Sequence, residues 1–307
     1  MTTRQPSNRS SKPNNTTNRF NVYQTRPAAA LNPRQSYLLG HRGARGEQLE
    51  NSAAGFDHLQ QLHRRYPKQL VGIEFDVQLT ADNKLLVHHD DTLSRLQQRQ
   101  SRIDQCNSTE LLRYPLQGNR HLLLEDMAPY LNGYQRIELE VKTHERSNYQ
   151  RLTQALAQAL LDPSLKPLPI TLTSFDVTLH QYMLNHPVLS QYPRGLLVEP
   201  KFAVDTASMV TKDEHADFQP TMLMSTNAPL MDTALIAKRL GCQGVGLFFP
   251  LYDLPSQSSQ QLLQSFRHYQ LTTTAWTVNE PQHAKRLINL GVNYIISDFP
   301  SRLVTLF

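Results

Sequence analysis

Cysteine, tryptophan and long apolar runs are all scarce in this chain of 307 residues. Its two cysteines, Cys106 and Cys242, are too few and too distant in sequence for a disulfide framework or a thiolate metal site. No apolar run approaches the roughly 20 residues that a membrane-spanning helix needs, so we expect no transmembrane segment. The chain is 39% hydrophobic and 19% charged, which is typical of a globular protein with a full core.

Acidic residues are absent from residues 1–36, where the basic residues are Arg4, Arg9, Lys12, Arg19, Arg26 and Arg34. The whole chain has a formal net charge of +5, so setting aside these six positive charges leaves residues 37–307 at −1. The basic pI of about 9.2 therefore comes from the tail. Because the remainder is nearly neutral, we expect no nucleic-acid partner.

The same segment is rich in Ser, Thr, Asn and Pro and poor in large apolar side chains. We therefore expect residues 1–36 to be a disordered basic tail, because they bury too little surface to offset the entropy of ordering. The tail lacks the apolar stretch of about 7–15 residues that a secretory signal requires, which favours a cytoplasmic protein. An organelle transit peptide, also rich in Arg, Ser and Thr, is the alternative.

From residue 37 onward, short apolar runs alternate with helix-like segments. The expected strands are 37–40, 71–77, 136–142, 169–175, 194–199, 244–249, 272–278 and 294–298. The expected helices are 51–65, 148–161, 176–184, 232–240, 255–269 and 280–290. This alternation predicts an α/β protein with a parallel sheet and helical crossovers. Eight strands in a chain of this length predict a closed (β/α)8 barrel, also called a TIM barrel.

Three segments do not fit a simple repeat of strand and helix. Residues 84–89 follow the turn signal Ala81-Asp82-Asn83 and are expected to return as the second arm of a hairpin. Residues 91–125 lack a strong helical pattern, so we interpret them as a small insertion after the second strand. Residues 221–225 are a candidate ninth strand.

Two carboxylates interrupt the second expected strand. Because side chains alternate along a strand, Glu74 and Asp76 lie on the same side of it. Strand 136–142 repeats the pattern with Glu140 and Lys142. Carboxylates that converge inside a barrel repel one another unless a cation lies near them. The spacing therefore predicts an all-oxygen site for Mg²⁺ or Ca²⁺, with Lys142 as a fixed positive charge.

Histidine and arginine follow the first strand directly, as His41 and Arg42 between two glycines. Active sites of such barrels lie at the carboxyl ends of the strands. There, a histidine exchanges protons near neutral pH and an arginine binds phosphate with two hydrogen bonds. His89 ends the hairpin arm and is expected to return to the same rim. Alternation sends its neighbour His88 to the opposite face.

These motifs together resemble the glycerophosphodiester phosphodiesterase family. The matching segments follow the family's order and cover essentially the whole folded part of the chain. They are HRGARGEQLENS (41–52), GIEFDVQLT (72–80), LLVHHDDTL (85–93), ELEVK (138–142), TSF (173–175), TAWTVNE (274–280) and GVNYIISDFP (291–300). The absence of a signal and the short insertion resemble the short, cytoplasmic-type bacterial branch.

The resemblance implies that residues 37–307 form one TIM-barrel domain with the insertion at about 91–125. It implies divalent-metal-dependent hydrolysis of glycerophosphodiesters to an alcohol and sn-glycerol 3-phosphate, as part of glycerol and lipid metabolism. Carried over position by position, the metal ligands are Glu74, Asp76 and Glu140, the acid–base pair is His41 and His89, the phosphate contacts are Arg42 and Lys142, the substrate-mouth aromatic is Trp276, and Glu50 lies near the metal or Arg42.

The sequence also departs from the family pattern. Asp91 replaces the usual proline after His89-Asp90, and we expect its charge to raise the pKa of His89. The segment 246–255 does not show the usual pocket motif, so the leaving-group side stays undefined.

Two other functions remain open from the sequence. One is a lysophospholipase D or a sphingomyelinase-D-like enzyme that acts on membrane lipids, and the other is a barrel that binds without catalysis. The sequence does not choose between Mg²⁺ and Ca²⁺, and it does not reveal the alcohol head group, the division of roles between the histidines, the oligomeric state or the role of the tail.

Overall fold

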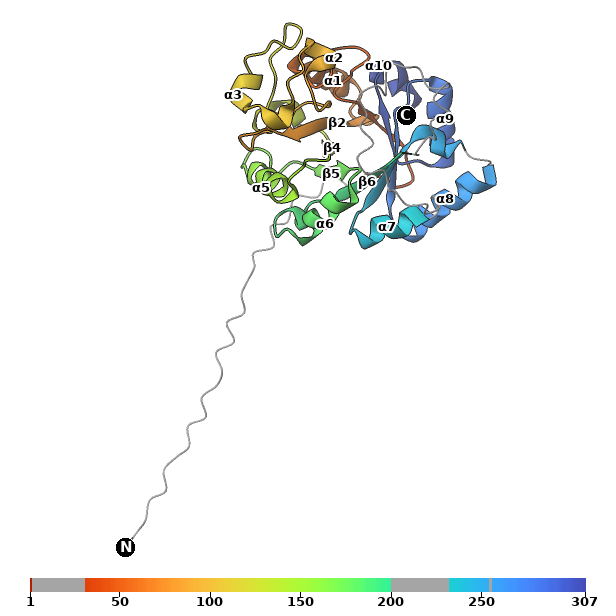
Figure 1. Cartoon of the computed structure of the whole chain (residues 1–307). Helices are drawn as coiled ribbons and strands as arrows, with labels where there is room; N and C mark the ends of the chain where they lie inside the picture. The colour runs from red at the N-terminus through yellow and green to blue at the C-terminus, as the bar shows by residue number, and fades with distance from the viewer. Residues whose placement is uncertain (2–30, 200–231, 254–255) are drawn as a thin grey trace, which may run out of the picture.

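A closed barrel of parallel strands forms the centre of the computed structural model, which describes residue 1 and residues 31–199, 232–253 and 256–307 (Figure 1). Within these residues, eight parallel strands form the barrel. They are β1 (Tyr37–Gly40), β2 (Leu70–Leu79), β4 (Arg136–Val141), β5 (Ile170–Ser174), β6 (Arg194–Val198), β7 (Gly244–Phe248), β8 (Thr272–Trp276) and β9 (Tyr294–Ser297). The barrel closes because β1 pairs with both β2 and β9. The predicted (β/α)8 fold is confirmed.

Helices surround this barrel in Figure 1. They are α1 (Ala53–Arg65), α5 (Tyr149–Leu160), α6 (Val177–Asn185), α7 (Thr233–Arg239), α8 (Ser256–His268), α9 (Pro281–Leu290) and α10 (Pro300–Leu303). Short polar side chains begin several of them: the Ser52 hydroxyl, the Asn148 amide oxygen and the Asp176 carboxylate each accept a hydrogen bond from the first turn. Such caps satisfy backbone N–H groups that have no partner inside a helix.

Alternation along β2 separates the core from the barrel interior. Ile73, Phe75 and Val77 are fully buried, and the Phe75 ring contacts Phe56 of α1 edge to face. These residues therefore face the helices, and the residues between them face inward. The helix-facing layer supplies most of the hydrophobic core.

The insertion follows the hairpin that the sequence predicts. Strand β3 (Leu85–Val87) pairs antiparallel with β2. After it come α2 (Ser94–Gln97), η1 (Ile103–Gln105), α3 (Ser108–Leu111), η2 (Leu124–Asp126) and α4 (Ala128–Leu131). A separate small apolar cluster holds the insertion together, formed by Leu86, Leu93, Ile103, Cys106, Leu111 and Leu123. The segment is thus a folded excursion between β3 and β4 rather than one long crossover helix.

The described end of the tail contacts the barrel. The Ser36 hydroxyl donates to the Val292 carbonyl at 2.6 Å, and the Asn293 amide donates to the Pro33 carbonyl at 2.9 Å. Residues 31–36 therefore pack against the barrel, whereas residues 2–30 of the predicted tail and the candidate ninth strand at 221–225 lie outside the described residues. In the part of the chain that the structure describes, no helix is long and apolar enough to cross a membrane.

Candidate active site

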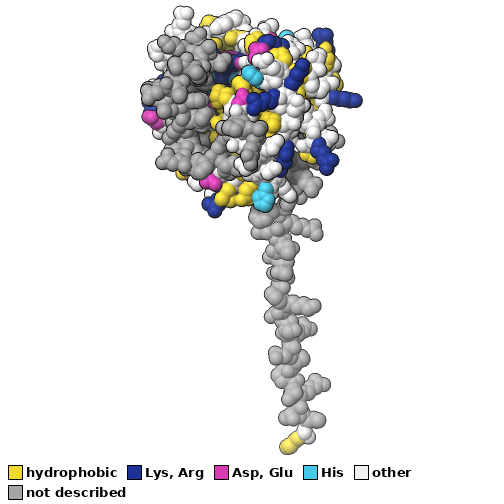
Figure 2. Space-filling model, turned by 90° about the vertical axis from the view of Figure 1, so that its right-hand side faces the viewer, with side chains coloured by type: hydrophobic (Ala, Val, Ile, Leu, Met, Phe, Trp, Pro, Cys, Tyr) yellow, Lys and Arg dark blue, Asp and Glu magenta, His cyan; other side chains and the backbone are white. Residues whose placement is uncertain are grey.

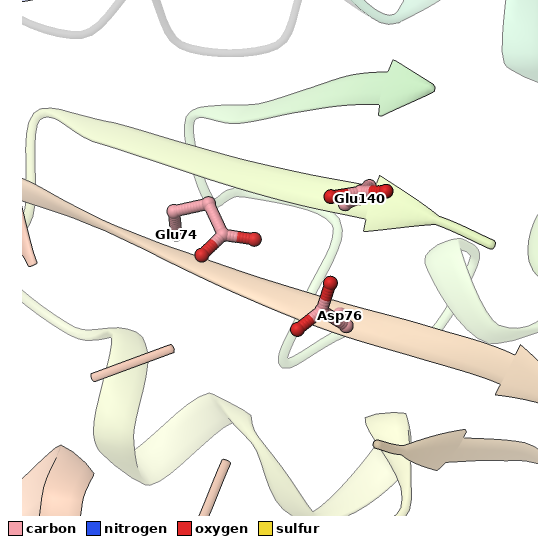
Figure 3. A group of neighbouring side chains, drawn as sticks. All are labelled: Glu74, Asp76 and Glu140. Carbon is pink, nitrogen blue, oxygen red and sulfur yellow. The ribbon is translucent and has the colours of Figure 1, made fainter. Parts of the chain in front are cut away.

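Three buried carboxylates meet inside the barrel, as the sequence predicts. The register of β2 and β4 places Asp76 beside Glu140, and Glu74 lies two residues before Asp76 on the same face. One oxygen from each side chain lies within 4.8 Å of the others. Figure 3 shows the three carboxylates coming from these two neighbouring strands.

The cluster fits a hard divalent cation. Glu74 Oε1 is buried without a hydrogen-bond partner, and Asp76 Oδ1 forms no hydrogen bond although it is in ion-pair contact with Lys142. The Lys142 ammonium lies 2.6 Å from Glu140 Oε1 and 3.1 Å from Asp76 Oδ1. Besides Lys142, the Arg42 guanidinium lies 3.4 Å from Asp76, but it also pairs with Glu50. The three neighbouring carboxylates therefore remain undercompensated, and buried unpaired charge is costly. Oxygen donors with unsatisfied lone pairs are the ligands that Mg²⁺ and Ca²⁺ prefer.

Neighbouring charges also shift the pKa values of these carboxyl groups. Burial, together with the charges of Asp76 and Glu140, raises the pKa of Glu74 well above its usual value. Burial also acts to raise the pKa of Asp76, but the charges of Lys142, His89 and Arg42 outweigh it and hold that pKa well below the usual range. The carboxylates therefore compete for positive charge within one small space.

Arg42 lies in a tight turn that follows β1. Its backbone is left-handed (φ 48°), and its N–H donates to Glu74 Oε2 at 2.9 Å. The turn needs glycine at Gly40, where a Cβ would overlap the carbonyl oxygen of Gly43. The Arg42 guanidinium donates to Glu50 Oε1 at 3.0 Å and lies 3.4 Å from Asp76. Glu50 is thus in contact with Arg42, as the resemblance implied.

His41 is oriented by a carboxylate from the far end of the chain. Its Nδ1 lies 2.5 Å from Asp298 Oδ1, and its Nε2 lies 3.7 Å from Glu74 Oε2. Burial lowers the pKa of His41, although Asp298 opposes the shift. Burial acts against ionisation of Asp298, but His41 and Arg45 outweigh it and lower the pKa of this carboxyl to about 2. Asp298 is therefore an anion that fixes the ring and leaves Nε2 directed toward the cluster.

His89 has a matching arrangement with the next residue along the chain. Its Nδ1 lies 2.6 Å from Asp90 Oδ1, and Asp90 in turn accepts a hydrogen bond from Arg95 Nε at 2.7 Å. Arg95 also donates to both oxygens of Glu50 at 2.7 and 2.8 Å, which joins this pair to Arg42. The hydrogen bonds at Nδ1 leave Nε2 of His89 available, as they do in His41.

The expectation for Asp91 is wrong. The carboxylate of Asp91 pairs with Arg102 at 3.5 Å, away from His89. Burial lowers the pKa of His89 to about 3, and the charges of Arg42 and Lys142 act in the same direction. The expected separation of the two histidines is confirmed, because His88 faces the insertion, where its Nε2 lies 3.2 Å from the Thr92 carbonyl.

One cavity of about 170 Å³ is lined by both histidines, by Glu74 and Glu140 and by an aromatic wall. Trp276 lines this cavity, and its ring contacts Phe175 edge to face and Phe248 at a tilt, with centroids 5.4 and 5.6 Å apart. Glu199, at the end of β6, lies in the same lining. Burial, together with Glu140 and against the attraction of Lys142, raises the pKa of Glu199 to about 7.

All but two of the site residues predicted from the sequence line this cavity. The exceptions are Asp76, which contacts Lys142, and Glu50, which contacts Arg42. Sequence reasoning missed Asp298, Asp90, Arg95 and Glu199 as parts of the site. It also missed Asn51, whose amide donates to Asp76 at 2.9 Å. Asn51, Asp90 and Asp298 lie inside the quoted motifs, and Arg95 lies two residues after one of them. The motifs could therefore have drawn attention to these positions, but they do not predict which residues the side chains contact.

The fold and the site together define a phosphodiester hydrolase built on a (β/α)8 barrel. The model of the glycerophosphoryl diester phosphodiesterase family matches residues 41–302, and the chain belongs to this family. A glycerophosphodiester phosphodiesterase of Bacillus altitudinis is 24% identical over 270 residues, which cover 87% of this chain and 96% of that protein.

Solved structures share the fold. An Oleispira antarctica phosphodiesterase in complex with its product sn-glycerol 3-phosphate has a TM-score of 0.68 at 19% identity, over 88% of this chain and 96% of that one. A Thermotoga maritima glycerophosphodiester phosphodiesterase has a TM-score of 0.65 at 19% identity, over 89% and 98% of the two chains.

Proposed function

We propose that this chain hydrolyses glycerophosphodiesters to an alcohol and sn-glycerol 3-phosphate in a reaction that requires a divalent cation. One observation carries the proposal: two imidazoles, each with a carboxylate at Nδ1, open into the cavity that holds the buried acidic cluster. Membership in the family supports the reaction class, and the product in the Oleispira relative supports the glycerol 3-phosphate half of the substrate.

Glu74, Asp76 and Glu140 are the residues that would hold the cation. When bound, a divalent cation neutralises charge on phosphoryl oxygens during an in-line displacement. The site has oxygen donors only, which suits both Mg²⁺ and Ca²⁺. Asn51 and Lys142 orient the carboxylates, because the former donates to Asp76 and the latter contacts both Asp76 and Glu140.

Arg42 and Lys142 supply the fixed positive charges for the phosphate. Burial acts to lower the pKa of Arg42, but neighbouring carboxylates, Asp76 first among them, raise it above its usual value. The guanidinium therefore stays charged, and Glu50 holds it in place through the 3.0 Å hydrogen bond. Preorganised donors of this kind stabilise charge that develops in the transition state.

His41 and His89 exchange the protons. One imidazole accepts the proton of the attacking group, and the other gives a proton to the leaving alcohol. If water attacks, sn-glycerol 3-phosphate forms directly; if the neighbouring glycerol hydroxyl attacks, a cyclic phosphate forms first and water opens it in a second step with the same two imidazoles. Positioned acids and bases typically contribute a factor of about 10²–10⁴. The carboxylates Asp298 and Asp90 fix the rings and stabilise the imidazolium that forms. Trp276 lines the cavity, and substrate carbon atoms would pack against its ring.

The test is an EDTA-reversible activity assay on a panel of substrates. Purified protein is incubated with glycerophospho-choline, -ethanolamine, -glycerol and -inositol, and with lysolipid vesicles, before and after chelation and with Mg²⁺ or Ca²⁺ added back. We expect sn-glycerol 3-phosphate to be released from the soluble diesters, to disappear with EDTA and to return with the metal. Release that is insensitive to chelation, or no release at all, would contradict the proposal.

The other functions receive less support. A lipid-directed enzyme would need an apolar rim, yet the large exposed hydrophobic side chains of the described residues beyond Met1 are Leu161, Tyr182 and Leu184, none of which lines the cavity. On the face in Figure 2, the Lys and Arg side chains that the structure describes are scattered rather than gathered in one patch. The absence of a nucleic-acid partner stays a prediction, as does cytoplasmic location.

A further inference from the structure

Arg95 extends from the insertion and contacts two carboxylates of the active site at once. Its Nη1 and Nη2 donate to Glu50 Oε2 and Oε1 at 2.8 and 2.7 Å, and its Nε donates to Asp90 Oδ2 at 2.7 Å. Only 7% of the Glu50 side chain and 3% of the Asp90 side chain are exposed. Three donors of one planar group therefore bind two buried carboxylates, which is a more fixed geometry than that of a single surface ion pair.

Each of these carboxylates also contacts one side chain that takes part in the proposed chemistry. Glu50 Oε1 accepts from Arg42 Nη1 at 3.0 Å, and Arg42 is the proposed phosphate contact. Asp90 Oδ1 lies 2.6 Å from His89 Nδ1, and His89 belongs to the proposed acid–base pair. Arg95 is thus connected to a phosphate contact through Glu50 and to a proton-transfer residue through Asp90.

The backbone of Arg95 is held by the insertion itself. Helix α2 follows Leu93, which is fully buried in the small apolar cluster of the insertion. At the end of the helix, the Gln97 amide donates to the Pro115 carbonyl at 3.1 Å and lies 2.6 Å from Nε2 of the buried His121. Because these contacts do not involve Glu50 or Asp90, a substitution at Arg95 can remove the link to the active site and leave the core of the insertion in place.

A guanidinium at this position controls orientation as well as charge. Its planar fork fixes the direction of both carboxylates, which a lysine ammonium cannot do with one nitrogen. Burial acts to raise the pKa of Asp90, but the hydrogen bonds from His89 and Arg95 outweigh it and hold that pKa well below its usual range. Displacement of a catalytic group by about 1 Å can cost roughly 100-fold in rate, so a shared clamp on two such groups affects turnover.

We propose that Arg95 is a positioning residue through which the insertion holds His89 and Arg42 at the mutual distance that the reaction requires. This inference rests on the proposed function, because it assigns a supporting role in the same reaction. Arg95 acts through Asp90 and Glu50 and takes no part in the chemical step.

The first test measures kcat/KM with the soluble diester that the wild type hydrolyses fastest. The variants are Arg95→Met and a control, Arg99→Met. Arg99 is exposed in the same insertion, where its guanidinium lies 4.1 Å from the Tyr114 ring centroid, and its replacement changes the net charge by the same amount. We expect Arg95→Met to lower kcat/KM by about 10–100-fold, the usual effect of removing a residue that orients an active-site group, and Arg99→Met to stay within about twofold of wild type.

A double-mutant cycle separates positioning from a general weakening of the fold. Arg95→Met is combined with Asp90→Asn and, separately, with Glu50→Gln. If Arg95 acts through these carboxylates, part of its effect is already lost in each background. The additional loss should therefore be smaller than in the wild type by a factor of about three or more. A residue that only supports the fold would give additive losses.

A second substitution keeps the proposal testable if Arg95→Met does not fold, which circular dichroism establishes. Arg95→Lys keeps the positive charge but cannot form the three hydrogen bonds of the guanidinium. We expect it to lower kcat/KM by about tenfold.

The outcomes separate the positioning role from the reaction. If the wild type hydrolyses none of the diesters, the proposed function fails and the role of Arg95 fails with it. If the wild type is active and the Arg95 variants keep its kcat/KM, the reaction stands and the positioning role is refuted. Losses equal to that of Arg99→Met, or losses that add up with Asp90→Asn and Glu50→Gln, would also refute it.

Discussion

Replacement of Asp298 by asparagine tests whether the proton chemistry depends on the orientation of His41. The Asp298 carboxylate has three neighbours that carry N–H groups in the structure: Oδ1 lies 2.5 Å from His41 Nδ1 and 3.2 Å from Arg45 Nε, and Oδ2 accepts from Asn279 Nδ2 at 2.9 Å. The Asn279 amide cannot turn around, because its oxygen accepts from the backbone N–H of Asp298 and from the Ser297 hydroxyl. In Asp298→Asn, the orientation that keeps the hydrogen bond from Asn279 directs the side-chain oxygen at Asn279 and the new NH2 group at His41 and Arg45.

The consequence is a change of tautomer. With an NH2 group opposite, Nδ1 of His41 has to accept a hydrogen bond, so the proton of the neutral ring resides on Nε2. Nε2 then cannot accept a proton from the substrate, and an imidazolium loses the carboxylate that stabilises it. We expect kcat to fall by about 10²–10⁴, the usual contribution of a positioned acid or base, and KM to change by less than about threefold.

A matched control exists on the surface. His58 Nε2 lies 2.5 Å from Glu47 Oε2, which is the same type of pair outside the cavity. Glu47→Gln should leave both kinetic parameters unchanged. Circular dichroism and thermal unfolding establish that both variants fold. A folded Asp298→Asn protein with wild-type kcat would refute the reasoning, because the orientation of His41 would then not matter for turnover.

Two further predictions concern the other histidines. His89→Ala should reduce kcat by about 10²–10⁴ in the soluble-diester assay while the unfolding midpoint changes little, and wild-type turnover would remove His89 from the acid–base pair. His180 is fully buried beside Cys242, and burial lowers its pKa to about 4. The folded state therefore holds it neutral, whereas the unfolded chain protonates it near pH 6.5, so stability is lost as the pH falls between these values. The loss is about 3 kcal/mol. Urea unfolding at pH 7 and pH 4.5 measures it, and His180→Gln should show a smaller decrease than wild type; an equal decrease would contradict the assignment.

The acidic cluster was predictable because it depends only on local rules. Alternation along a strand places Glu74 and Asp76 on one side, and parallel neighbouring strands bring Glu140 to the same level. The strands and helices were predictable for a related reason: apolar periodicity and capping residues act over a few positions. The described elements begin and end within about two residues of most predicted ones.

The partners of the histidines were not predictable, because they depend on directions in space. Asp298 and His41 are 257 positions apart in the sequence. They come into contact because β1 pairs with β9 when the barrel closes. Asp90 and Asp91 are the two residues after His89, and no sequence pattern shows which of the two carboxylates contacts its imidazole. The structure shows that Asp90 does, while Asp91 is drawn to Arg102 in the insertion.

The insertion itself contributes to the site in a way that its weak sequence pattern did not indicate. Arg95 of α2 contacts Glu50 and Asp90 together. It thereby connects the turn that carries Arg42 to the hairpin arm that carries His89. Burial acts to raise the pKa of Glu50, but Arg42 and Arg95 outweigh it and hold the carboxylate ionised. The insertion between β3 and β4 therefore fixes the position of Arg42, the proposed phosphate contact, relative to His89, a proposed acid–base residue.

The carboxyl ends of the barrel strands carry two kinds of side chain, which are held by two kinds of contact. The groups assigned to chemistry come from β1, β2, β4 and the hairpin, and salt bridges cross-link them, so a substitution in one disturbs several others. Phe175, Phe248 and Trp276 lie at the ends of β5, β7 and β8, and their rings pack against one another. Contacts of that kind tolerate exchange of one side chain at lower cost than a buried ion pair does. Exchange of one of these rings should therefore cost less folding stability than removal of one partner of the Lys142–Glu140 pair.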